Sequence, residues 1–297
     1  MPEKANQALS DVSKTLLLPL YNRAMESQRP DAMIKDEKAV ALVAQMMADG
    51  AIRYDFSRVR QIKMTELLQA MRIIFTREMD RCARDFLTRH PDAVVVHIGC
   101  GLDSRFERVD NGTVEWYDLD LPEVIELRRK LFGDEGERHH LVGCSVLEDA
   151  WLEAVSAHRS RPYLFLAETV FVYFTEAQVR SLVLSLRDNF SGAELVFDGW
   201  RPFEVWLANR YLSNTQFGGL MRWGFWRGQE IEKWGDPSTS LPSTSLRAGG
   251  IHLLDEWGFF DQPEPRLDSF RWMAPIFRLF KPMRIFHFQL GKAAEGE

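Results

Sequence analysis

The chain has few of the features that mark secreted, zinc-binding or membrane-spanning proteins. Its three cysteines, Cys82, Cys100 and Cys144, are odd in number and widely spaced, and no CxxC pair occurs among the 297 residues. That usage argues against a zinc module and against the disulfide framework of a secreted protein. No apolar run approaches the roughly 18 residues of a membrane helix. The apolar residues 16–20 include Pro19 and follow several charged residues, unlike a signal peptide, so we expect a cytoplasmic soluble protein.

The chain also has little excess charge of either sign. Its 37 Lys and Arg residues face 43 Asp and Glu residues, which gives a net charge of −6. A mildly acidic chain has no overall electrostatic attraction to nucleic acid or to an anionic membrane, so we expect neither as a partner. With 45% hydrophobic and 27% charged residues, the composition excludes a collagen-like or mainly disordered protein.

The spacing of apolar residues changes along the chain. Up to about residue 90 they recur at helical intervals, as at 42–47 and 67–74, and Pro91 ends the last of these helices. Beyond it, short apolar strands alternate with helices. The predicted strands are 93–98, 114–117, 140–142, 163–167 and 195–197, and the predicted helices are 122–132, 151–158 and one that runs to 190 from a capping box of Thr175 and Gln178. This alternation predicts an α/β fold with a mostly parallel sheet and helices on both faces, which binds ligands beyond the carboxyl ends of its strands.

The alternation stops after residue 200. Residues 236–250 repeat the letters STSL around prolines and end in paired glycines, which is typical of a surface loop. Strand-like stretches follow at 270–273 and 283–290. Tryptophans are concentrated between Trp200 and Trp234, and their large flat side chains suit a planar substrate, with Trp223 as a candidate contact. A packing layer or a homodimer contact is the alternative use of this stretch.

A glycine pair follows the first predicted strand. Gly99 and Gly101 allow a sharp turn and the close approach of a ligand, but the third glycine of a dinucleotide-binding fingerprint would stand at position 104, where the chain has Ser104. Asp103 lies where a pyrophosphate would need amide donors, and its carboxylate suits a cationic amino or sulfonium group instead. The loop therefore favours S-adenosylmethionine over NAD. The alternative for Asp103 is a cap on the next turn.

Polar residues also follow the next three strands. Asp120 lies 21 residues after Gly99, where an acidic residue binds a ribose diol, although a helix N-cap is the alternative. Ser145 and Val146 are placed to touch the edge and the face of an adenine. Glu168 ends an apolar strand, and a buried carboxylate needs a partner, which a cofactor ammonium or an arginine would provide. Tyr173, five residues further on, lines the pocket or packs.

Together these segments resemble the leucine carboxyl methyltransferase family, specifically its branch typified by the tetracenomycin polyketide synthesis O-methyltransferase. The likeness covers most of residues 12–200, and its parts are residues 15–27, residues 35–39, VVVHIGCGLDSRFER at 94–108, WYDLDLPEVIELRRKLF at 116–132 and LAETVFVYFT at 166–175. The resemblance implies a class I, Rossmann-like methyltransferase fold that uses S-adenosyl-L-methionine.

The resemblance also implies a role for each of these positions. The methionine part of the cofactor would be held by Gly99, Gly101 and Asp103, the ribose by Asp120 and the adenine by Ser145 with Val146, while Glu168 would face the cofactor's centre. An arginine in the helix before the first strand holds the cofactor's α-carboxylate in the family. Arg77 fits this role best, with Arg72 in reserve, and Arg23 would serve the cofactor or a substrate carboxylate. The alternative for all three arginines is an exposed surface charge.

Two departures from the family pattern accompany the likeness. Many members have an acidic residue before the adenine contact, where this chain has Cys144 and Ser145, and the pattern TR-x-x-x-D is altered around Arg77. The implied organisation is a helical lid at 1–90, a cofactor-binding core at 91–200, a substrate-side insertion at 201–250 and C-terminal strands at 251–297 that complete the sheet.

The expected activity is transfer of a methyl group to an oxygen of a small aromatic or polyketide-like molecule. A carboxylic acid with a pKa near ~4 is already ionised at neutral pH, whereas a phenol near ~10 would gain from a general base. None of the seven histidines lies in a motif that marks a base, so no catalytic residue and no metal are expected. The alternatives are methylation of a protein C-terminal carboxylate, an NAD-dependent oxidoreductase and a non-catalytic cofactor-binding protein.

Overall fold

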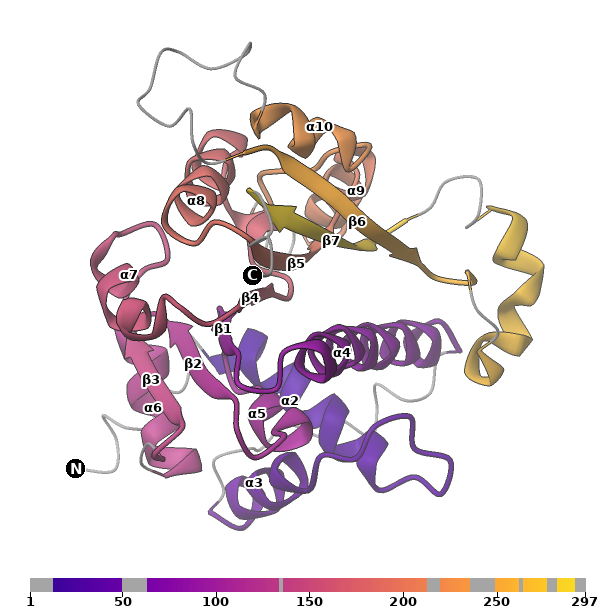
Figure 1. Ribbon diagram of the computed structural model, residues 1–297. Helices are drawn as coiled ribbons and strands as arrows, with labels where there is room; N and C mark the ends of the chain where they lie inside the picture. The colour runs from indigo at the N-terminus through magenta and orange to yellow at the C-terminus, as the bar shows by residue number, and fades with distance from the viewer. Residues whose placement is uncertain are drawn as a thin grey trace.

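The computed structural model describes residues 13–49, 63–133, 136–212, 220–235, 249–261, 264–276 and 282–291 (Figure 1). Its helices are α2 (Ser13–Ser27), α3 (Glu37–Ala48), α4 (Lys63–Arg89), α5 (Arg105–Val109), α6 (Pro122–Phe132), α7 (Ala150–Val155), α8 (Glu176–Asn189), α9 (Pro202–Leu212) and α10 (Gln229–Glu232). Its strands are β1 (Val94–Ile98), β2 (Glu115–Asp120), β3 (His139–Gly143), β4 (Tyr163–Ala167), β5 (Ala193–Gly199), β6 (Ile251–Gly258) and β7 (Arg284–Leu290). The short 3-10 helices are η2 (Ser156–His158), η3 (Phe171–Tyr173), η4 (Lys233–Gly235) and η5 (Pro265–Met273).

The strands form one seven-stranded sheet in the order β3-β2-β1-β4-β5-β7-β6. Strands β1 to β5 pair in parallel, whereas β7 pairs antiparallel with both β5 and β6. The predicted α/β fold with a mostly parallel sheet is therefore confirmed. The strand order reverses between β1 and β4, and ligands bind at such a reversal, beyond the carboxyl ends of the strands.

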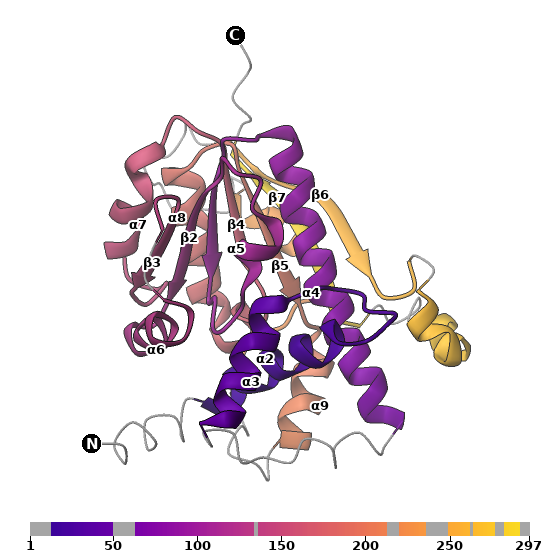
Figure 2. The same cartoon turned by 90° about the horizontal axis from the view of Figure 1, so that it is seen from below.

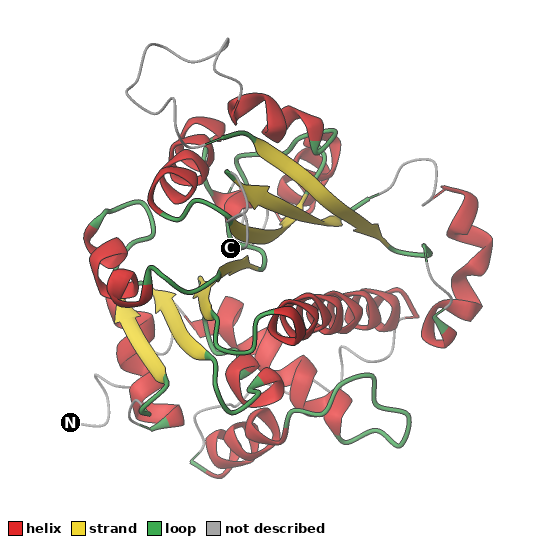
Figure 3. Cartoon of the chain, viewed as in Figure 1, coloured by secondary structure: helices red, strands yellow, loops and turns green. Residues whose placement is uncertain are grey.

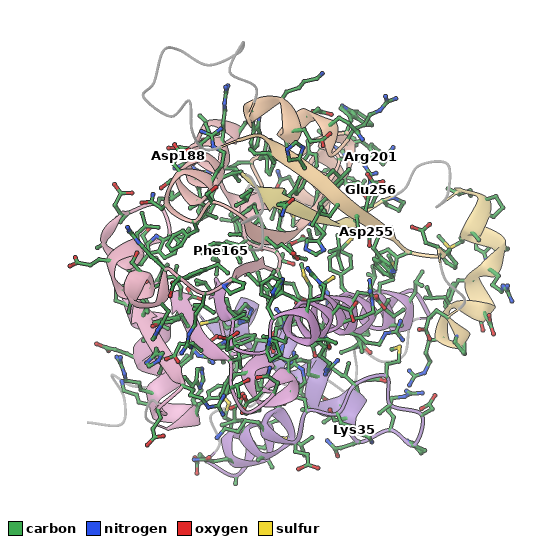
Figure 4. The ribbon with its side chains drawn as sticks, viewed as in Figure 1. Lys35, Phe165, Asp188, Arg201, Asp255 and Glu256 are labelled. Atoms are coloured by element: carbon green, nitrogen blue, oxygen red, sulfur yellow. The ribbon has the colours of Figure 1, made fainter. Side chains whose placement is uncertain are left out.

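The central strands are apolar because both faces of the sheet are covered. All residues of β1, β4 and β5 are buried. Trp151 of α7 and Leu186 of α8 belong to a core on one face, and Phe86 of α4 and Val109 of α5 belong to a core on the other (Figure 3). Phe165 of β4 lies near the middle of the molecule in Figure 4 and is fully buried.

Local sequence signals set the ends of several helices. Helix α6 has Pro122 in its first turn, where the missing N–H costs nothing. Helix α8 begins with the predicted capping box, in which the side chains of Thr175 and Gln178 each bond the backbone of the other. Helix α4 ends at Arg89, shortly before Pro91. These helices confirm the predictions made for them.

Helices α2 and α3 cover the carboxyl ends of the parallel strands, at the same end of the molecule as α9 (Figure 2). Leu20 of α2 and Leu42 of α3 pack with Leu102 of the glycine loop, and Leu127 of α6 lies against this cluster. The N-terminal helices thus form part of the surroundings of the predicted site.

The C-terminal part differs from the prediction. The expected strand at 270–273 is wrong, because these residues end the 3-10 helix η5, which begins at Pro265 after the capping residue Glu264. The second C-terminal strand is instead β6, which pairs with the outer edge of β7 and whose exposed residues weaken its apolar pattern. Most of the loop predicted at 236–250 lies outside the described residues. None of the described helices is long and apolar enough to cross a membrane.

Candidate functional site

The glycine loop leaves the carboxyl end of β1 in a conformation that favours glycine. Gly99 has φ +66° and Gly101 has φ +51°, both in the left-handed region. A Cβ atom on Gly99 would also overlap the Cγ2 atom of Val170, which follows β4. The backbone of the loop and the segment after β4 therefore lie in direct contact at the point where the strand order reverses.

Asp120 fixes this loop from the end of β2. Its two carboxylate oxygens accept one backbone hydrogen bond each, from Gly101 N at 2.7 Å and from Leu121 N at 2.8 Å. Burial raises the pKa of the carboxyl, although these hydrogen bonds oppose the increase. Each oxygen keeps a further lone pair, so Asp120 can still accept hydrogen bonds from a ribose diol. The N-cap of α6 is Leu121, so Asp120 does not cap that helix.

Asp103, the carboxylate inside the loop, is surrounded by arginines. Arg108 Nη1 lies 2.8 Å away, Arg105 Nη2 3.2 Å and Arg23 Nε 3.4 Å. Burial alone would raise the pKa of Asp103, but these guanidinium groups hold it well below its usual range. The N-cap of α5 is Ser104, so the alternative role of Asp103 as a helix cap is not seen. Its negative charge is already neutralised by the protein.

These residues belong to a larger buried group, which we call the arginine cluster. It consists of three buried guanidinium groups and four carboxylates: Arg23, Arg105, Arg108, Asp36, Asp80, Asp103 and Glu168. A half-exposed fourth arginine, Arg84, reaches Asp80 only at 3.9 Å. The three buried guanidinium groups balance the three buried carboxylates, so the partly exposed Glu168 is the carboxylate in excess of these seven side chains. Asp36 is held by the most partners, since it accepts from Arg23, Arg108, Ser104 Oγ and the backbone N of Ala39.

Glu168 is the member of the cluster that faces outward. It accepts hydrogen bonds from Arg105 Nη2 and, at 3.0 Å, from Thr76 Oγ1 of α4. Its side chain is 22% exposed, against 11% for Asp103 and 1% for Asp36. The excess negative charge of the cluster therefore lies beside the open side of Glu168, where it would attract a cationic group.

His97 in β1 serves the packing of this cluster. Its Nε2 atom lies 3.0 Å from Arg105 Nη1, and its Nδ1 atom lies 3.2 Å from Asp118 Oδ1. A guanidinium group can only donate, so Nε2 must accept and Nδ1 carries the proton toward Asp118. With both ring nitrogens engaged, His97 is a structural residue and is not available as a general base.

Three of the residues expected at the site are directed elsewhere. Arg77 pairs with Glu264 at 2.6 Å and with Glu78 at 3.1 Å, on the side of α4 that faces η5. Arg23 is buried, and its guanidinium group supports the loop through Leu102 O as well as its carboxylates. Trp223 is only 6% exposed and lies in the core, stacked on Phe225 with ring centroids 4.8 Å apart.

The residues predicted to contact the adenine follow β3. Cys144 N donates to Asp120 O at 2.9 Å, which continues β3 toward Ser145. Val146 is buried and lines a cavity of about 220 Å³ between α7 and α8, together with Leu147, Trp151 and Gln178. The end of β3 is thus bonded to Asp120 just before Ser145, and the adenine contacts of Ser145 and Val146 stay predictions.

The structure also reveals a carboxylate that the sequence analysis missed. Asp198 near the end of β5 is buried and accepts hydrogen bonds from Thr169 N and, at 2.7 Å, from Trp200 Nε1. Burial raises the pKa of this carboxyl to about 6. Thr169 has φ +57°, a strained value for a β-branched residue, directly after Glu168. Asp198 comes directly after the predicted strand at 195–197, as Glu168 comes after the one at 163–167, and the same reasoning would have found it.

The residues at the carboxyl ends of β1, β2 and β4 fit S-adenosyl-L-methionine. Gly99 and Gly101 provide an open loop, and Asp120 retains lone pairs for two hydroxyl groups. Glu168 carries the excess negative charge that a sulfonium and an ammonium require, whereas a pyrophosphate would be repelled.

Comparison with known proteins agrees with this chemistry. The family model "Leucine carboxyl methyltransferase" matches residues 17–186. The tetracenomycin polyketide synthesis O-methyltransferase TcmP of Streptomyces glaucescens is 32% identical over 256 residues, which cover 86% of each chain. The S-adenosyl-L-methionine-dependent methyltransferase dpfgK of Gibberella zeae is 27% identical over 92% of this chain and 90% of its own.

A solved structure shares the fold at low sequence identity. A DUF574 family protein of Streptomyces avermitilis superposes with a TM-score of 0.57 at 14% identity, over 95% of this chain and 99% of that chain. The family match over more than half of the chain and the relative at 32% identity establish more than the fold. This protein belongs to the leucine carboxyl methyltransferase family and is an S-adenosyl-L-methionine-dependent O-methyltransferase with a class I fold.

Proposed function

We propose that this enzyme methylates the carboxylate of a small aromatic or polyketide-like acid. The observation that carries the methyl-transfer part of the proposal is the charge arrangement at the carboxyl ends of β1, β2 and β4, where Asp120 bonds the glycine loop and Glu168 is partly exposed. Support for the acceptor comes from TcmP, whose name places it in polyketide synthesis. The three cysteines are free thiols, which supports work in the reducing cytoplasm.

The residue roles follow from the geometry. Asp120 would accept hydrogen bonds from the ribose, Ser145 and Val146 would border the adenine, and Gly99 with Gly101 would let the methionine part approach the backbone. Glu168 would lie next to the cationic centre, held in place by Thr76 and Arg105. We assign Asp103 and Arg23 to support of the loop, because their charges are satisfied within the arginine cluster.

The reaction needs little chemistry from the protein. Bound S-adenosylmethionine supplies a methyl group on a positively charged sulfur. The residues of this chain orient the two reactants in line and exclude water, which is enough for a displacement. A carboxylate acceptor is already ionised at neutral pH, so no base has to remove a proton. That agrees with the structural role of His97, whose two ring nitrogens are both engaged.

The proposal is tested by binding and by product chemistry. Calorimetry with S-adenosylhomocysteine should give micromolar binding, and NAD should give none. A mass-spectrometric screen of aromatic acids, with matched phenols and a peptide that ends in leucine, then identifies the acceptor. A methyl ester is hydrolysed by mild alkali, whereas an aryl methyl ether is stable. An alkali-stable product, or transfer to the peptide alone, would contradict the proposed acceptor.

A further inference from the structure

Two carboxylates lie next to each other at the carboxyl ends of β4 and β5. Ala167 pairs with Phe197 in the parallel register, so Glu168 and Asp198 are the next residues along the two strands. Glu168 is bound by the guanidinium group of Arg105, whereas no cation of the described residues forms an ion pair with Asp198. Asp198 is nevertheless only 3% exposed. A buried carboxylate without a cation depends on its hydrogen bonds, so the groups that Asp198 binds indicate its role.

Both oxygens of Asp198 accept hydrogen bonds. Oδ1 accepts from the backbone N–H of Thr169, and Oδ2 accepts from Trp200 Nε1 at 2.7 Å. The N–H of Thr169 belongs to the peptide bond that follows Glu168. Strand β4, which ends at Ala167, therefore holds the backbone on one side of Glu168, and Asp198 holds it on the other.

Thr169 has a backbone conformation that needs this support. Its φ of +57° lies in the left-handed region, which is strained for a β-branched residue. Directly after it, Val170 lies so close to Gly99 that a Cβ atom on Gly99 would overlap its Cγ2 atom. Without an acceptor for its N–H, Thr169 would relax toward an ordinary conformation. The peptide bond that carries Glu168 would then turn, at the point where the segment meets the glycine loop.

We propose that Asp198 is a positioning residue for the cofactor, which keeps Glu168 directed at the cationic part of S-adenosyl-L-methionine. This inference rests on the role that the proposed function gives to Glu168. Thr76 and Arg105 fix the carboxylate at the tip of the Glu168 side chain, whereas Asp198 fixes the backbone from which the side chain extends. The cofactor then meets a negative charge that is already in place, and binding does not have to order it.

The test compares two ligands by calorimetry. S-adenosylmethionine carries the cationic groups, whereas 5′-methylthioadenosine keeps the nucleoside and the sulfur but has no charge. Asp198→Asn should weaken S-adenosylmethionine by about 5- to 10-fold, as expected for one hydrogen bond, and 5′-methylthioadenosine by less than about 2-fold. Trp200→Phe removes only the second donor to Asp198 and should weaken S-adenosylmethionine selectively by about 2- to 3-fold. Asp188→Asn, on the exposed surface, is the matched control and should bind both ligands as the wild type does.

Two further backgrounds distinguish positioning from a general loss of stability. Glycine adopts the left-handed conformation without strain, so Thr169→Gly removes the need for support at this residue. When Asp198→Asn is added to Thr169→Gly, the affinity for S-adenosylmethionine should change by less than about 2-fold. The same small change is expected when Asp198→Asn is added to Glu168→Gln, because no charge is left to be positioned.

The other outcomes separate this inference from the proposed function. If S-adenosylmethionine does not bind the wild type, the proposed function fails. If Glu168→Gln binds both ligands as the wild type does, the role of Glu168 fails and the inference fails with it. If Glu168→Gln weakens S-adenosylmethionine but Asp198→Asn weakens both ligands equally or neither, Asp198 only supports the fold and the inference is overturned. Urea denaturation shows whether Asp198→Asn is folded. If it is not, Trp200→Phe decides in the same way.

Discussion

The two sides of the ligand-binding edge use arginine in opposite ways. On the β1 and β2 side, Arg23, Arg105 and Arg108 are buried and each contacts at least two carboxylates. On the β4 side, Arg72 of α4 is exposed, one helical turn from the Thr76 that bonds Glu168, and no carboxylate of the described residues forms an ion pair with it. Arginines with satisfied partners maintain the shape of the loop, whereas an arginine without a carboxylate partner is free to meet a ligand. The distinction separates residues that stabilise the site from residues that recognise its ligands.

The largest effect is expected on the buried side, from Arg105→Ala. The substitution leaves Asp80, Asp103 and Glu168 with less compensation in a buried environment. Removal of one partner of a buried ion pair costs about 3–5 kcal/mol of the free energy of unfolding. Urea denaturation measures the loss. Arg271→Ala, whose side chain is 70% exposed, is the control and should lose less than about 0.5 kcal/mol. A loss for Arg105→Ala as small as that of the control would show that the cluster is not structural.

The next largest effect is expected on the pH dependence of stability, and it comes from Asp198 of β5. Burial raises the pKa of Asp198 to about 6, above its value in the unfolded chain. Its contribution to stability is therefore complete below about pH 4 and is lost as the pH rises through 6. Relative to the wild type, Asp198→Asn should gain about 2–3 kcal/mol in free energy of unfolding between pH 4 and pH 7.

Urea denaturation at several pH values measures this difference. The matched control is Asp188→Asn, on the exposed surface at the end of α8 (Figure 4). The slope with pH is the quantity to compare, because the amide also disturbs the hydrogen bonds to Thr169 and Trp200 at every pH. A slope for Asp198→Asn that matches the control would refute the raised pKa.

Asp120→Ala is expected to weaken the binding of the cofactor by a free energy of similar size. The variant removes an acceptor for the ribose and also the hydrogen bond that holds Gly101 N. Loss of hydrogen bonds to a charged acceptor corresponds to about 1.5–3 kcal/mol, or roughly 10- to 150-fold in the dissociation constant of S-adenosylhomocysteine. Calorimetry measures it, with Asp110→Ala as the control. Unchanged affinity would remove Asp120 from the site.

The smallest effect is expected from Arg77→Ala, which tests the role implied by the family resemblance. Arg77 is partly exposed and pairs with Glu264 and Glu78 away from Glu168. Pairs of this kind contribute about 0–1 kcal/mol to stability. We expect the affinity for S-adenosylhomocysteine to change by less than 2-fold in calorimetry. A 10-fold loss that spares adenosine would mean that Arg77 turns inward when the cofactor binds.

The sequence predicted the fold better than the directions of its long side chains. The apolar strands and the capping box of Thr175 and Gln178 are local signals, and they define the sheet and α8. Asp120 and Glu168 could be predicted as site residues because each stands at the carboxyl end of a predicted strand. The partner of Arg77, by contrast, is Glu264, 187 residues further along the chain. An arginine reaches several ångströms from its backbone, so tertiary contacts decide where its charge lies.

The tryptophans illustrate the same limit. Trp223 and Trp206 are both close in sequence to β5, yet Trp223 is buried in the core and Trp206 on α9 is 59% exposed. Composition indicates that an aromatic surface exists in this region. Which ring belongs to it depends on the face that α9 and the following segment turn toward the sheet.

Asp36 has a consequence for the way in which molecules reach the site. This one carboxylate caps α3 and also binds Arg23 of α2, Ser104 of the glycine loop and Arg108 of α5. If α2 and α3 swung away as a lid, Asp36 would lose these partners and the loop would lose its support. The N-terminal helices are therefore expected to stay closed throughout the catalytic cycle, as a fixed wall.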